Sequence, residues 1–157
     1  METQQAFAPA SPRTPVQLLP YDATVFISLN DFPLARNWLE EHRQTIEALG
    51  RVICQHGLQK EIGVSLLHRH FQIRETEVLV RNRQNGEAVT TPAEYTSVSS
   101  SIAPFLWKLA TGRSGKGFYP LEFVRCSDKY ETVSGQVSRI RAAADFLTKF
   151  AEALDAF

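Results

Sequence analysis

The sequence has little of several features that would assign a protein to a class at once. Its 157 residues include two cysteines, Cys54 and Cys126, which are far apart in the chain. Two such cysteines cannot form a disulfide framework, and they lack the close spacing of a zinc knuckle or a redox pair. Reduced thiols of this kind are typical of a cytoplasmic protein, which is the location we expect.

The chain also lacks an excess of charge of either sign. It has 17 lysines and arginines against 17 aspartates and glutamates, so its formal net charge at pH 7 is zero. Nucleic-acid phosphates and anionic lipid surfaces attract proteins through an excess of positive charge. The charge balance therefore predicts neither a nucleic-acid partner nor a membrane partner.

Long hydrophobic runs are absent as well, since no apolar stretch reaches the roughly 18 residues that a membrane-spanning helix needs. The first 20 residues hold four prolines among small and polar residues, without the basic start and apolar run of a secretory signal. We expect a flexible leader over residues 1–20 and a single globular domain over residues 21–157. The hydrophobic content of 43% is ordinary for such a domain.

The pattern of apolar residues predicts an α+β domain, in which an antiparallel sheet of four to five strands is packed by two longer helices. The helices are expected at about residues 32–57 and 134–157, where apolar residues recur three and four positions apart. Residues 92–107 are expected to form a long loop across the sheet. The expected strands, rich in β-branched and aromatic residues, are 23–29, 61–73, 77–84, 87–91 and 118–125.

One turn is specified by only two residues, Asn85 and Gly86. Both residue types accept the positive φ angles that a two-residue hairpin requires. The strands on either side, 77–84 and 87–91, are therefore expected to pair as a hairpin. The preceding strand, 61–73, is expected to pair antiparallel with 77–84.

The segment with recognisable chemistry is His68-Arg69-His70, inside the strand expected at residues 61–73. Successive side chains of a strand point to opposite faces, so the two histidines would share a face, with Cα atoms about 6.5 to 7 Å apart. From that separation two imidazoles can converge on one metal ion or one substrate. Leu66 would lie on the same face, which predicts an apolar pocket with the histidines at its mouth.

Three interpretations of the histidine pair remain open. As ligands of a divalent metal ion, His68 and His70 need a third ligand, for which Glu75 is the nearest candidate. As catalytic groups without a metal, one histidine would accept a proton near neutral pH, and the other histidine, or Arg69 and its neighbours, would stabilise developing charge. Glu75 would fix the tautomer. In the third interpretation, both histidines only form hydrogen bonds to backbone or solvent on a polar face.

Four short motifs lie between residues 62 and 124. They are Leu66-Leu67-His68-Arg69-His70-Phe71, Glu77-Val78-Leu79-Val80, Ala103-Pro104-Phe105-Leu106-Trp107 and Tyr119-Pro120-Leu121-Glu122-Phe123. Together they resemble a pattern found in small uncharacterised proteins, mostly fungal. The resemblance implies no particular reaction, but it implies that the histidine motif, Trp107 and Glu122 belong to one site. The residues that we expect to line the pocket are Leu66, Trp107, Tyr119 and Glu122.

Two kinds of function fit these observations. The first is a small soluble enzyme that acts on an organic small molecule through His68 and His70. The second is a non-catalytic ligand-binding or protein-interaction module that forms a homodimer through the wide apolar stripe of its C-terminal helix. The only cofactor that the sequence suggests is a divalent metal ion.

Overall fold

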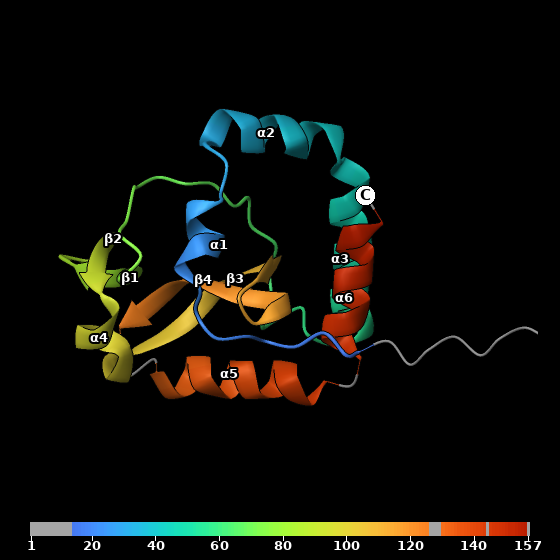
Figure 1. The fold of residues 1–157 in the computed structure, drawn as a ribbon. Coiled ribbons are helices and arrows are strands. Elements are labelled where there is room, and N and C mark those ends of the chain that lie inside the picture. Colours follow the sequence, from blue (N-terminus) through green and yellow to red (C-terminus); the bar gives the residue numbers. More distant parts are fainter. Residues whose placement is uncertain (1–13, 126–129, 144, 157) are drawn as a thin grey trace, which may run out of the picture.

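The structure, a computed structural model, describes residues 14–125, 130–143 and 145–156. In these residues a four-stranded sheet is surrounded by helices, which confirms the α+β class (Figure 1). The strands are β1 (Glu77–Gln84), β2 (Glu87–Glu94), β3 (Ile102–Gly112) and β4 (Gly115–Arg125). The helices are α1 (Ala23–Ile27), α2 (Phe32–Glu41), α3 (Arg43–Gln55), α4 (Tyr95–Val98), η1 (Ser99–Ser101, a 3-10 turn), α5 (Tyr130–Ala142) and α6 (Phe146–Asp155). None of the described helices is both long and apolar enough to cross a bilayer.

The sheet has the strand order β2-β1-β4-β3. It consists of two antiparallel hairpins, β1 with β2 and β3 with β4, which are joined by a parallel pairing of β1 with β4. The sheet is therefore mixed, and the expectation of a purely antiparallel sheet is corrected at this pair. Each hairpin is set by its own turn, whereas the pairing between hairpins depends on the crossover through α4 and η1, which no turn signal encodes.

The turn at Asn85 and Gly86 forms as predicted. Their φ angles are 52° and 84°, and Gln84 pairs with Glu87 directly across the turn. β1 has the predicted bounds, and β2 continues beyond the predicted end through Pro92 to Glu94. A proline is tolerated there because β2 is an edge strand, where an amide hydrogen is not needed on the outer side.

The long loop expected at residues 92–107 is wrong. After β2 and the short helices α4 and η1, the apolar run from Ile102 begins β3, an eleven-residue strand at the other edge of the sheet. The β3–β4 pairing shifts register beside Pro104, between that residue and Leu106. An irregular edge strand accommodates proline, so this run forms a strand although its composition did not predict one.

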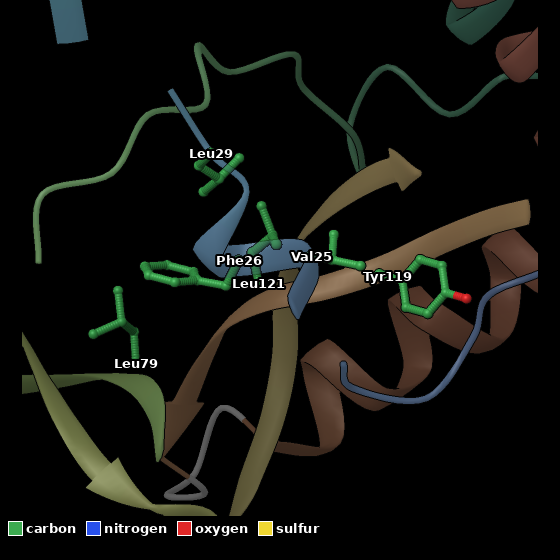
Figure 2. Packing of buried hydrophobic residues seen from close by; sticks show 6 residues of the cluster. All are labelled: Val25, Phe26, Leu29, Leu79, Tyr119 and Leu121. Atoms are coloured by element: carbon green, nitrogen blue, oxygen red, sulfur yellow. The ribbon is translucent and has the colours of Figure 1, made fainter. Parts of the chain in front are cut away.

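Residues 23–29 were expected to form a strand, and this is also wrong, because residues 23–27 form the short helix α1. Apolar β-branched and aromatic residues favour strands only where a pleated surface receives them, and tertiary packing overrides that preference. Here α1 lies across the sheet and buries its apolar side chains against β1 and β4, as Figure 2 shows. The cluster consists of Val25, Phe26, Leu29, Leu79, Tyr119 and Leu121.

Each of the two long helices expected from the sequence is divided in two. The first breaks at His42, whose φ of −119° and ψ of 35° are not helical, and α2 and α3 then run in different directions (Figure 1). The second breaks between α5 and α6, where Asp145 has a φ of 59°. The helical spacing of apolar residues continues across each break, because the helices on both sides of it bury apolar side chains in the interior of the protein.

The apolar stripe of the C-terminal helix is used within the chain. Phe146 is buried together with Ile53 and Leu58, so α6 packs against α3 and the residues that follow it. Side chains on the same stripe, such as Phe150, also contact this cluster. A homodimer through this helix stays a prediction, and the internal packing of the stripe does not support it.

Part of the predicted flexible leader belongs to the fold. Residues 1–13 lie outside the described part of the chain, but residues 17–19 run beside β4. The amide of Leu19 donates to the carbonyl of Phe118 at 2.9 Å, and the amide of Phe118 donates to the carbonyl of Gln17 at 2.9 Å. This close approach requires a glycine at position 117, because a Cβ there would lie 2.6 Å from Leu19 Cδ1 and 2.7 Å from the Gln17 carbonyl oxygen.

The expected strand at residues 61–73 does not form. Residues 63–70 have no strand pairing, because β1 pairs with β2 on one edge and with β4 on the other. Both edges of the strand that 61–73 was expected to join are thus occupied. The segment instead crosses over the end of α1, where the amide of Arg69 donates to the carbonyl of Asn30 at 2.9 Å.

A buried carboxylate, that of Asp22, joins α1 to the β3–β4 hairpin. Its Oδ1 accepts hydrogen bonds from the amide and hydroxyl of Thr24, at 3.0 and 2.6 Å, which caps the helix. Its Oδ2 accepts from the amide of Arg113 at 2.8 Å, at the hairpin turn. Burial raises the pKa of this carboxyl, but the hydrogen bonds from Arg113 and Thr24 outweigh it, and the pKa lies below its usual value.

We predict that Asp22→Asn lowers the free energy of unfolding at pH 7 by about 2 kcal/mol, because hydrogen bonds to a buried charged acceptor are lost or weakened. The native pKa is below the unfolded value of 3.8, so this stabilisation is complete above that value and is lost as pH falls through the native pKa. Urea unfolding from pH 7 to pH 2.5 measures it.

The matched control is Asp31→Asn, which changes the exposed N-cap of α2, whose carboxylate accepts from the Leu34 amide at 3.3 Å. Asparagine caps helices about as well as aspartate, so this variant should unfold like the parent protein. Equal losses in the two variants, or a loss for Asp22→Asn that is the same at every pH, would contradict the role given to Asp22.

We also predict that Gly117→Ala lowers the free energy of unfolding by about 1 to 3 kcal/mol, because the new methyl group would displace residues 17–19 from β4. The control is Gly50→Ala within α3, where a Cβ meets nothing within 4 Å. That change should raise stability by up to about 1 kcal/mol through helix propensity. Thermal and urea unfolding of both variants give the comparison, and a Gly117→Ala protein as stable as the parent would count against the packing of the leader.

Candidate functional site

A cavity of about 780 Å³ lies along β3. Its walls come from the end of α1, the helices α2 and α3, residues 61–67, β3, and the helices α5 and α6. Most lining residues are apolar. Examples from the different walls are Leu29, Leu49, Leu66, Leu109, Val137 and Phe150. The volume falls within the range of about 300 to 1,000 Å³ that is usual for small-molecule sites.

The cavity follows the free edge of β3. Six consecutive residues of that strand, 104–109, line it. Because successive side chains of a strand point to opposite faces, a cavity that touches all six reaches both faces of the sheet around its edge. Trp107 therefore belongs to the lining, as does Leu66 from the segment opposite.

Tyr119 and Glu122, the other two residues expected in the pocket, lie elsewhere. Tyr119 is fully buried in the core beneath α1, where its hydroxyl donates to the carbonyl of Gly115 at 2.7 Å and accepts from the amide of Ser114 at 3.1 Å. The carboxylate of Glu122 is 3.4 Å from Arg81 Nη2 on the neighbouring strand. Neither residue lines the cavity.

Two lining residues mark the mouth of the cavity. Trp38 on α2 is 40% exposed and Val64 is 42% exposed, so each touches both the cavity and the solvent. Other exposed apolar side chains, Phe32 and Phe71 among them, come from the same part of the chain, residues 27–71. Exposed apolar side chains at the mouth of a cavity, such as those of Trp38 and Val64, are typical of a place where a ligand binds.

The two histidines lie close together although the expected strand is absent. The ring centroids of His68 and His70 are 4.1 Å apart with an interplanar angle of 65°, and the ring of Phe32 lies 5.0 Å from that of His68. His68 Nδ1 is 3.1 Å from the carbonyl oxygen of Leu66. Since His68 directly follows Leu67, a lining residue, the pair lies beside the cavity and outside its lining.

Arg69 does not approach the pair as a charge-stabilising group. Its guanidinium donates from Nη1 to the carbonyl of Ile27 at 3.2 Å, and its amide donates to the carbonyl of Asn30. Both acceptors lie at the C-terminal end of α1, where carbonyl groups lack helical partners. Arg69 therefore fastens the histidine segment to α1.

Glu75, the expected third ligand, has a different partner. Its Oε2 is 3.6 Å from Nη2 of Arg113, at the β3–β4 turn. Within the described ranges, no three or more histidine, cysteine, aspartate or glutamate side chains come close enough together to hold a metal ion. The structure thus brings His68 and His70 together without bringing Glu75 to them.

Lys108 is a lining residue that the sequence analysis missed. It is half-buried on β3, and none of the described carboxylates forms an ion pair with it. Burial lowers the pKa of its ammonium group. The sequence signal is a single lysine between Trp107 and Leu109, inside an apolar run, which composition alone does not distinguish from a solvent-facing residue.

Comparison of the chain with protein-family models, with curated proteins and with solved structures gives no match.

We predict that Arg69→Ala loosens the histidine segment without unfolding the domain. Loss of the side-chain bond to Ile27, worth about 1 kcal/mol, should speed hydrogen exchange of the Arg69 amide about five-fold. NMR-detected exchange measures this, with Arg51→Ala on the exposed face of α3 as the control. Unchanged exchange at residue 69 would show that the side chain does not anchor the segment.

Proposed function

We propose that this protein binds an organic small molecule with a largely apolar body in the cavity beside β3. The observation that carries the proposal is the cavity itself, about 780 Å³ with a mostly apolar lining and a mouth at Trp38 and Val64. A concave space of this size with a mainly apolar lining is typical of a small-molecule site. The cytoplasm is the proposed location, which the exposed free thiol of Cys54 supports.

The binding energy would come mainly from removing apolar ligand surface from water. Each Å² of apolar surface contributes about 25 cal/mol, so even a modest apolar body gains several kcal/mol in such a cavity. The exposed apolar side chains at the mouth would contact the ligand while it enters. The wall formed by residues 61–67 has no strand pairing, so it can move without breaking the sheet.

The test uses N-phenyl-1-naphthylamine, an uncharged apolar fluorophore. We expect saturable binding with enhanced fluorescence, and a higher midpoint of thermal unfolding when the fluorophore is present. Leu66→Trp adds an indole to the cavity wall and should weaken binding about tenfold, which corresponds to 1.4 kcal/mol.

Leu34→Trp adds the same indole to α2 at a residue that is 57% exposed and does not line the cavity, so binding should stay unchanged. Urea unfolding verifies that both variants are folded. If the fluorophore does not bind, or if the two variants bind it equally, the ligand is not in this cavity.

A second candidate function is acid and base catalysis by His68 and His70 on a ligand at the mouth. It is favoured by the position of the two rings, whose centroids lie 4.1 Å apart directly after residues 61–67, which form one cavity wall. Of two adjoining imidazole rings, one can accept a proton while its neighbour donates a hydrogen bond.

Nitrophenyl esters of increasing acyl length test this candidate. Turnover that rises with chain length, and that disappears in both His68→Ala and His70→Ala while the fluorophore still binds, would support catalysis. Turnover that is the same in the variants and the parent protein would leave binding as the function.

A further inference from the structure

Lys108 lies on β3, of which residues 104–109 line the cavity. It is paired in register with Tyr119, and residues paired across antiparallel strands project from the same face of the sheet. Tyr119 belongs to the core under α1, so Lys108 projects from the α1 face at the outer edge. Among the described residues that line the cavity, it is the one lysine or arginine.

The charge of Lys108 is not balanced from within the described part of the protein. Two acidic residues also line the cavity, and each already has a basic partner. Glu61 Oε1 is 3.4 Å from Arg139 Nε, and Asp155 pairs with Lys116. Lys108 therefore presents a half-buried ammonium group to an apolar space without a counter-ion.

We propose that the ligand is a long-chain carboxylate whose head group binds Lys108 and whose hydrocarbon tail fills the cavity. This inference rests on the proposed function and adds the chemical class of the ligand. A carboxylate would supply the missing counter-charge and restore hydrogen bonds to a group that burial has deprived of water. A neutral ligand would leave the ammonium uncompensated. A multiply charged ligand would need further cations, and the described residues of the lining supply none besides Lys108.

The experiment compares two ligands of equal chain length, hexadecanoate and 1-hexadecanol, as competitors of N-phenyl-1-naphthylamine below their aggregation concentrations. In the parent protein, hexadecanoate should compete about tenfold more strongly than the alcohol. In Lys108→Met, which keeps the apolar stem and removes the charge, the two should compete equally. Lys108→Arg keeps the charge and should keep the preference.

The matched control is Lys149→Met on α6, an exposed position outside the cavity lining, where the tenfold preference should remain. Binding of the fluorophore together with equal competition in the parent protein overturns the carboxylate assignment and leaves the proposed function intact. A preference that persists in Lys108→Met shows that another group holds the carboxylate. Absence of fluorophore binding overturns both proposals.

Discussion

The carboxylate of Asp22 is the contact on which the arrangement around the site depends. One oxygen starts α1 at Thr24, and the other holds the amide of Arg113 at the turn between β3 and β4. A helix of only five residues has little stability of its own, so its place on the sheet has to be set by such a contact and by the apolar cluster beneath it. The end of α1 in turn supplies the carbonyl groups to which Arg69 binds, and this contact holds the end of the segment whose residues 61–67 form a cavity wall.

The sequence predicted those parts of the fold that short-range chemistry determines. The hairpin at Asn85 and Gly86 follows from the φ angles of two residues, and β1 follows from a single run between turn signals. The parallel pairing of β1 with β4 does not follow from any local pattern, because it depends on which edges remain open after both hairpins have formed. Residues 61–73 alternate as a strand would, but they form no strand. Both edges of β1, the strand they were expected to pair with, are occupied by β2 and β4.

The candidate site was predictable to a similar extent. An extended backbone places residues two positions apart on the same side, so His68 and His70 come together with or without a neighbouring strand. The partners of that pair could not be predicted, because Glu75 and Arg69 are each drawn to groups on distant elements, the β3–β4 turn and the end of α1. Lys108 could not be recognised from the sequence, because apolar residues from α2, α5 and α6, which are distant in the sequence, form the cavity that it lines.

Lys108 also helps to explain why β3 can be an edge strand, with no further strand paired to its outer side. An exposed apolar edge strand invites pairing with other chains, and proteins protect such edges with proline, with irregular pairing, or with a charged side chain. β3 has all three: Pro104, the register shifts beside it, and Lys108. A charge that protects the edge while the cavity is empty becomes, when a carboxylate binds, the group that holds the ligand. In this proposal the protection of an open sheet edge and the selection of an anionic ligand are two consequences of one lysine on an apolar strand.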